Sequence, residues 1–102
     1  MKNVFSKMKP SGIFMNIGRG TCVNEEDLVK ALKSKTIAGG VLDVYKVEPL
    51  DKKSDLWKQS NLLMYPHCAD LDNDYFARSW VYWAENVDNF FKGKALTNLT
   101  DK

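Results

Sequence analysis

Residues 12–20 read GIFMNIGRG, an apolar run that ends in a glycine-rich turn. The run is bounded by glycine on both sides and, apart from its asparagine, shows no alternation between apolar and polar residues. It therefore predicts a buried strand over residues 12–17, followed by a turn at Gly18-Arg19-Gly20. Glycine in that turn allows backbone conformations that are closed to other residues, and it allows a close approach to a ligand.

The residues that follow this turn predict an amphipathic helix over residues 24–34. Asn24 suits the N-cap position, and the acidic side chains directly after it lie where the helix dipole favours negative charge. Apolar residues then recur at the spacing of one helix face: Leu28, Ala31 and Leu32. Upstream of the first strand, a short helical stretch that ends near Lys9 is broken by Pro10.

Two further apolar stretches predict strands. Residues 37–44 (IAGGVLDV) are expected to be buried on both faces, and residues 61–65 (NLLMY) predict a shorter strand that Pro66 ends. Between them, residues 46–60 predict a polar loop with one helical turn around Leu56-Trp57.

A long helix is expected over residues 73–92, with Asp72 directly before it and Gly93 directly after it. Its apolar side chains recur at helical spacing and are mostly aromatic: Phe76, Trp80, Trp83, Ala84, Val87, Phe90 and Phe91. Glycine is common directly after a helix because it adopts left-handed backbone angles easily. Three short strands cannot cover this much aromatic surface, which favours a docking surface for additional chain over an ordinary core helix.

The alternation of strands and helices predicts an α/β fold. Strands that are continuous apolar runs, with a helix between the first and the second, indicate a parallel sheet with flanking helices, followed by the long C-terminal helix. The chain has 102 residues, which is enough for one domain or for part of a larger one.

Composition argues against several classes of function. The net charge is +2 and there is no basic block, so nothing indicates binding to nucleic acid. No apolar run approaches the roughly 18 residues of a membrane span, and no secretory signal is evident. Cys22, Cys68 and the single histidine, His67, lack the close ligand spacing of a zinc site. No disulfide is expected, and the default location is the reducing cytoplasm.

Four polar side chains fall at the carboxyl ends of the predicted strands, where open parallel sheets bind ligands. Arg19 follows the first strand, Asp43 and Glu48 follow the second, and His67 follows the third. Taken singly, each has an ordinary interpretation, as a surface ion-pair partner, a turn former, a solvated loop charge and a structural histidine. Because all four fall at one sheet edge, an active site is an equally good interpretation.

Five stretches of the chain, in order and at matching spacing, resemble the C-terminal portion of the D-isomer-specific 2-hydroxyacid dehydrogenases. They are NIGRG (16–20), VNEEDLVKAL (23–32), IAGGVLDVYKVEPL (37–50), NLLMYPHCAD (61–70) and ENVDNFFKGKALTNL (85–99). The resemblance implies part of a Rossmann domain and an oxidoreductase that uses NAD or NADP. It also implies hydride transfer between the nicotinamide and a small 2-oxo or 2-hydroxy acid, such as glyoxylate or hydroxypyruvate.

The resemblance implies catalytic roles for three residues. Arg19 matches the arginine that holds the substrate carboxylate and carbonyl, because a planar guanidinium can bond two oxygens at once. His67 matches the general acid/base that exchanges a proton with the carbonyl oxygen. Glu48 matches the carboxylate that fixes the imidazole tautomer and raises its pKa. Formate dehydrogenases of this superfamily have glutamine there, so Glu48 favours a 2-hydroxy acid over formate.

Cofactor-binding roles are implied in the same way. Asp43 matches the residue that holds the nicotinamide carboxamide. The nicotinamide side of the cleft would be lined by Asn16, Ile17 and Gly18, with Arg19 and His67 beside it. The sequence departs from the family at Tyr65, where threonine is frequent, and at residues 68–70, where small residues are common. Both departures bear on substrate preference.

The family's G-x-G-x-x-G fingerprint, which grips the cofactor pyrophosphate, is absent from this sequence. By resemblance, residues 1–71 are the second half of the dinucleotide-binding domain, and residues 72–102 are the inter-domain crossing helix and tail. The chain by itself is therefore expected to be inactive, and the full-length protein is expected to form a homodimer. The alternative is a non-catalytic NAD-sensing or protein-binding module of the same fold.

Overall fold

The computed structural model describes residues 4–100, and the chain divides after Ala69 into two compact units. The described part of the first unit holds a three-stranded sheet, one α-helix and three short 3-10 helices. Their bounds are η1 (Phe5–Lys7), β1 (Ile13–Asn16), η2 (Gly20–Cys22), α1 (Glu25–Lys33), β2 (Gly39–Leu42), η3 (Asp55–Lys58) and β3 (Leu62–Met64). The second unit contains α2 (Tyr75–Phe91).

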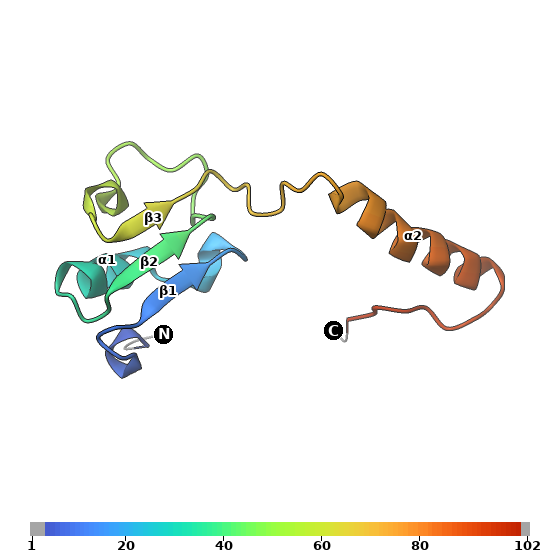
Figure 1. Cartoon of the computed structure of the whole chain (residues 1–102), viewed down its shortest axis with the longest axis horizontal. Coiled ribbons are helices and arrows are strands. Elements are labelled where there is room, and N and C mark those ends of the chain that lie inside the picture. The colour runs from blue at the N-terminus through green and yellow to red at the C-terminus, as the bar shows by residue number, and fades with distance from the viewer. Residues whose placement is uncertain (1–3, 101–102) are drawn as a thin grey trace. The chain divides into compact units, whose positions relative to one another are not determined.

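The three strands form one parallel sheet in the order β1-β2-β3, drawn in blue, green and yellow in Figure 1. Met15 of β1 is in register with Val41 of β2, which is in register with Leu63 of β3. The predicted parallel α/β fold is therefore confirmed. Because the strands are parallel, the segments that follow them all leave from one edge of the sheet.

Each strand is shorter than predicted. The prediction of a strand over residues 37–44 followed the apolar run, but only Gly39–Leu42 pair as β2. Ile37 and Val44 lie outside the strand and are nevertheless fully buried. The length of the apolar run thus indicates which residues are buried. The ends of the strand depend instead on the hydrogen bonds to the neighbouring strands.

One face of the sheet is covered and the other is open. On the covered face, Leu28 and Leu32 of α1 belong to the same buried cluster as Leu42 and Leu62 of the sheet. On the open face, Ile13 and Met15 of β1 are 64% and 60% exposed, and Leu63 of β3 is 61% exposed. The prediction of a buried strand over residues 12–17 is therefore wrong for the open face of β1, because apolar side chains do not reveal which segment covers them.

The predicted N-cap of α1 is confirmed. Oδ1 of Asn24 accepts a hydrogen bond from the backbone N–H of Asp27 at 2.9 Å, and the helix ends at Lys33 with Ser34 as its C-cap. The cap satisfies one of the N–H groups that have no partner inside the helix. The buried side chains of α1 are the three predicted for its apolar face.

Gly20 is required by the packing of the chain itself. A Cβ atom on Gly20 would overlap the carbonyl group of Tyr45 and the backbone nitrogen of Lys46. Among the glycines of residues 4–100, only Gly93 has a positive φ. The expectation that the turn after β1 needs glycine for unusual backbone angles is therefore wrong. Gly20 is needed because two backbone segments pass within contact of each other.

The second unit consists mainly of α2, which begins at Tyr75, two residues later than predicted. The preceding residues form a turn in which Oδ1 of Asp72 accepts from the backbone N–H of Asp74 at 3.0 Å. Aspartate side chains that bond to nearby backbone favour turns over helix, which explains the later start. At the other end, Gly93 has a φ of 62°, as expected for the residue after a helix.

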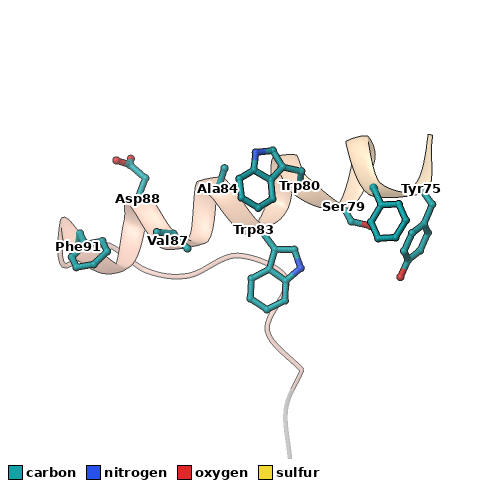
Figure 2. Close-up of a pocket in the computed structure, with 9 residues that line it drawn as sticks. Tyr75, Ser79, Trp80, Trp83, Ala84, Val87, Asp88 and Phe91 are labelled. Carbon is teal, nitrogen blue, oxygen red and sulfur yellow. The ribbon is translucent and has the colours of Figure 1, made fainter. Parts of the chain in front are cut away.

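No residue of α2 is buried. An open groove of about 790 Å³ runs along the helix, and its lining comes from α2 itself (Figure 2). The exposed apolar side chains of this lining include Phe76, Trp80, Trp83, Val87 and Phe91. Within residues 4–100, no helix combines the length and the apolar character needed to cross a bilayer.

Candidate active site

Glu48 and His67 are in direct contact although 19 residues separate them in the sequence. Nδ1 of His67 lies 2.6 Å from Oε2 of Glu48. Glu48 belongs to the loop after β2 and His67 to the turn after β3, so the pairing of these strands brings the two side chains together. Both remain accessible to solvent, with 45% of the His67 side chain and 34% of the Glu48 side chain exposed.

Both carboxylate oxygens of Glu48 have a donor. Oε2 faces the imidazole of His67, and Oε1 accepts a hydrogen bond from the backbone N–H of Tyr45 at 2.8 Å. The bond to the imidazole, followed by the bond to the Tyr45 N–H, lowers the pKa of Glu48. At neutral pH the side chain is therefore an ionised acceptor with a fixed orientation.

The environment of His67 favours its protonated form. The hydrogen bond to Glu48 and the charge of that carboxylate raise the pKa of His67, and the charge of Asp43 adds to the effect. The guanidinium of Arg19 acts in the opposite direction. Nδ1 is held by Glu48, whereas Nε2 has no hydrogen-bond partner within the described part of the chain. This nitrogen is the one placed to exchange a proton with a bound molecule.

Asp43 fixes the turn that carries His67. Its two carboxylate oxygens accept hydrogen bonds from the backbone N–H groups of Cys68 and Ala69, each at 2.8 Å. The side chain is nearly buried, since Asp43 is only 3% exposed. The bond from Cys68 is the main cause that lowers the pKa of Asp43, so the carboxylate stays ionised. His67 itself has a φ of 56°, a left-handed conformation that is uncommon outside glycine and is maintained by these contacts.

The turn after β1 is shaped by Asn16. Its Oδ1 accepts from the backbone N–H of Gly18 at 3.1 Å, and its Nδ2 donates to the carbonyl oxygen of Arg19 at 2.9 Å. Asn16 is buried, whereas Ile17 and the two residues after it are exposed. A buried amide therefore holds an exposed loop whose backbone and guanidinium face solvent.

The structure brings Arg19 into the same neighbourhood without direct contact. Nη1 of Arg19 donates to the carbonyl oxygen of Gly18 at 2.8 Å. No hydrogen bond or ion pair within residues 4–100 joins the guanidinium to Glu48 or His67. Its charge nevertheless acts on the pKa of His67, as expected for a cation on the same sheet edge. The remaining guanidinium donors are therefore available to an anion.

A small open pocket lies beside the Glu48–His67 pair. It has a volume of about 350 Å³ and a largely apolar lining that includes both residues of the pair, Tyr45 and Trp57. The groove along α2 is larger, but Asp88 is the only titratable side chain of its lining apart from the phenol of Tyr75. The pocket at the sheet edge is therefore the one of the two that is lined by a contacting acid and imidazole.

The role of Tyr45 was not predicted from the sequence. Its phenol oxygen donates to the carbonyl oxygen of Tyr65 at 2.8 Å, and it also lies 3.3 Å from the carbonyl oxygen of Leu42. The only sequence signal is its position between Asp43 and Glu48, which predicts proximity to the site but no particular contact. Apart from the Glu48–His67 contact, the hydrogen bonds of the site have a backbone group as one partner. Residue type gives little information about which backbone group is bonded.

Within residues 4–100, no group of three or more His, Cys, Asp or Glu side chains is arranged to hold a metal ion. Cys22 and Cys68, both described by the structure, are not joined by a disulfide.

Comparison with known proteins places the chain in a family. Residues 1–69 match the family model described as D-isomer specific 2-hydroxyacid dehydrogenase, NAD binding domain. The glyoxylate/hydroxypyruvate reductase A of Enterobacter sp. (strain 638) is 34% identical over 101 residues, which cover 99% of this chain and 32% of that protein. The glyoxylate reductase of Aeropyrum pernix is 37% identical over 95 residues, covering 93% of this chain and 28% of that protein.

A solved structure gives the same result. The D-isomer specific 2-hydroxyacid dehydrogenase from Xanthobacter autotrophicus Py2, in complex with NADPH and MES, superimposes with a TM-score of 0.81 at 34% identity. The match covers 95% of this chain and 39% of that one. The chain thus spans about a third of the length of these relatives. With a family match over most of its length and a matching fold, the chain belongs to the D-isomer specific 2-hydroxyacid dehydrogenase family.

Proposed function

We propose that this chain supplies the catalytic edge of an NAD(P)-dependent dehydrogenase that interconverts a small 2-oxo acid and the corresponding 2-hydroxy acid. The observation that carries the proposal is the contact of 2.6 Å between Nδ1 of His67 and Oε2 of Glu48. This contact leaves Nε2 of His67 open at the edge of the sheet from which Arg19 also projects. The two relatives named above are reductases of glyoxylate, one of them also of hydroxypyruvate, and these are the substrates we propose.

In this proposal His67 is the general acid and base. Its raised pKa favours the protonated ring, from which Nε2 can donate its proton to the carbonyl oxygen of the 2-oxo acid. Glu48 holds Nδ1 and stabilises the charged ring before the transfer. In the oxidative direction the neutral ring takes the hydroxyl proton back. A nicotinamide, when bound, supplies or accepts the hydride at the substrate carbon.

Arg19 is the proposed substrate anchor. Its guanidinium is exposed and can present two parallel N–H donors to a carboxylate and the neighbouring carbonyl oxygen. A 2-oxo acid has these two acceptors on adjacent carbons. With the carbonyl oxygen bonded to Arg19 and facing Nε2 of His67, proton transfer and polarisation act on the same atom.

The residues present fit the nicotinamide end of NAD or NADP. The exposed backbone of Ile17 and Gly18 offers a surface for the ring, supported by the buried amide of Asn16. The carboxylate of Asp43 accepts two backbone N–H groups. An ionised carboxylate has about four acceptor positions, so lone pairs remain for a carboxamide N–H. The choice between NAD and NADP is left open by these residues.

The rest of the cofactor site lies outside these residues in this proposal. We assign residues 1–71 to the second half of the dinucleotide-binding domain and residues 72–102 to the crossing helix and tail. The relatives are about three times as long, and the pyrophosphate-binding fingerprint is absent from this sequence. We therefore propose that activity requires a longer protein. By resemblance to the family we also propose that this protein is a homodimer and acts in the cytoplasm.

The test is turnover by the protein made from the complete reading frame that contains this chain. It should reduce glyoxylate or hydroxypyruvate with NADH or NADPH. His67→Ala should lower kcat by about 10²–10⁴-fold, the usual contribution of general acid–base catalysis. An unchanged rate would refute the assignment. If the intact protein shows no turnover but captures a protein partner in an NAD-dependent manner, the sensing module is the better description.

A further inference from the structure

We infer that Tyr45 is a positioning residue that sets the distance between Glu48 and His67. Its backbone holds one partner, and its side chain holds the segment that carries the other. The backbone N–H of Tyr45 holds the carboxylate of Glu48, and its phenol holds the backbone just ahead of His67. The inference rests on the proposed function, because a fixed Glu48–His67 pair matters for catalysis only if His67 transfers a proton.

The first contact fixes the carboxylate. The N–H of Tyr45 donates to Oε1 of Glu48 at 2.8 Å, which leaves Oε2 directed at the imidazole. Glu48 is on an exposed loop, and an exposed glutamate that bonds only to histidine would lose much of that contact to side-chain rotation. The bond to the Tyr45 backbone restricts this rotation.

The second contact fixes the imidazole. The phenol O–H of Tyr45 donates to the carbonyl oxygen of Tyr65 at 2.8 Å, two residues before His67. The N–H of Tyr65 donates to the carbonyl oxygen of Leu42 at 2.8 Å, so its peptide groups are held on both sides. On the far side of His67, Asp43 holds the next two backbone N–H groups. Segment 43–48 thus forms hydrogen bonds to the backbone before His67, to its imidazole and to the backbone after it.

Tyr45 is suited to this task by its environment. The side chain is partly buried against the core cluster, so the ring is anchored while the hydroxyl reaches the turn. Burial, together with the negative charge of Asp43, raises the pKa of Tyr45. The phenol therefore remains protonated and remains a donor throughout the neutral range.

The experiment uses His67 as its own probe. It is the only histidine of the 102 residues, so its ring carbon and nitrogen signals can be followed by NMR through a pH titration without assignment ambiguity. Three variants of the chain are compared with the parent: Tyr45→Phe, Glu48→Gln and the control Tyr82→Phe. Tyr82 is 55% exposed on α2. Its substitution by phenylalanine removes the same hydroxyl group at a position far from Tyr45 in the sequence. Circular dichroism verifies that each variant is folded.

In Tyr45→Phe the pKa of His67 should fall by a fraction of the fall in Glu48→Gln, because the carboxylate stays charged but is on average more distant. The charges of Asp43 and Arg19, which also act on His67, are the same in both proteins. Amide exchange at residues 65–69 should become faster in Tyr45→Phe, and Tyr82→Phe should change neither quantity. If exchange becomes faster but the pKa of His67 is unchanged, Tyr45 only anchors the backbone and the inference is wrong.

A second readout comes from the full-length enzyme. There Tyr45→Phe should lower kcat about 5-fold, the equivalent of one neutral hydrogen bond, and should shift the basic limb of the reduction profile to lower pH. KM for the cofactor should not change. A lowered pKa of His67 in a protein without turnover supports Tyr45 as a positioning residue and refutes the proposed function. An unchanged limb in an active enzyme refutes the inference alone.

Discussion

Gly20 lies so close to Tyr45 that a single methyl group on the glycine would overlap the tyrosine carbonyl. This contact joins the turn after β1 to the segment after β2. It therefore connects the Arg19 loop to the residue that bonds both Glu48 and the His67 turn.

Gly20→Ala should destabilise the chain and disturb the site together. Because the overlapping atoms belong to backbone, no side-chain rotation can relieve the clash, and we expect a loss of about 1–3 kcal/mol in the free energy of unfolding. Urea denaturation measures this loss. Gly18→Ala is the matched control, since the nearest atom to its Cβ would lie at 3.6 Å. Equal losses for the two variants would contradict this account.

Glu48→Gln should lower the pKa of His67 toward its ordinary value of about 6.5. In the proposed mechanism reduction requires the protonated ring, so the rate falls as pH rises through this pKa. In the full-length variant the fall should begin at lower pH than in the parent enzyme. The profile of kcat/KM against pH measures it, because that profile reports groups of the free enzyme. A limb at the same pH in both proteins would show that Glu48 does not set the pKa.

The same pair predicts how stability depends on pH. A raised pKa for His67 means that the folded chain binds its proton more tightly than the unfolded chain. The stabilisation is complete below the unfolded pKa and disappears as pH rises through the folded pKa. The urea midpoint of Glu48→Gln should therefore differ more from the parent midpoint at pH 6 than at pH 9. A constant difference would argue against the pairing in solution.

Asp43→Asn should loosen the turn after His67. Asparagine keeps one acceptor oxygen but directs an NH₂ group at the second backbone N–H, so one of the bonds from Cys68 and Ala69 is lost. Amide hydrogen exchange at these two residues should become about tenfold faster, consistent with the loss of a hydrogen bond to a charged group. Asp55→Asn, an exposed carboxylate in η3, is the control and should leave both amides unchanged.

Arg19→Lys should weaken substrate binding in the full-length enzyme. Lysine keeps the charge but cannot offer two parallel donors, so KM for the 2-oxo acid should rise about tenfold or more. The dissociation constant for the cofactor, measured by fluorescence, should stay the same. The only other arginine, Arg78, lies in α2 and pairs with Asp72, so Arg78→Lys serves as the control. A change in KM of the same size in both variants would remove the support for Arg19 as substrate anchor.

Local features of the fold could be predicted because their causes are local. The cap at Asn24 and the positive φ of Gly93 depend on residues within one turn of the helix, and both were predicted. The parallel sheet followed from continuous apolar runs with a helix between the first and the second. Strand ends could not be predicted, because Ile37 and Val44 are buried without pairing in a strand.

Contacts between distant backbone groups could not be predicted at all. The bond that the N–H of Cys68 donates to Asp43 spans 25 residues, and the bond that the phenol of Tyr45 donates to the carbonyl oxygen of Tyr65 spans 20. Every residue type offers the same backbone acceptor and nearly every type the same donor, so sequence carries no signal for such partners. Side chains with distinctive chemistry can be located from the sequence, so Glu48 and His67 were placed at two strand ends, and the family resemblance implied their contact.

The bare face of the sheet has a practical consequence for any preparation of these 102 residues. Ile13, Met15 and Leu63 present aliphatic carbon to water on an open three-stranded sheet, which is the kind of surface that associates with its own copies. Sedimentation velocity should show a weight-average mass that grows with protein concentration. Titrations of His67 therefore belong at the lowest workable concentration, and replacing Met15 by lysine would be the first step toward a well-behaved sample.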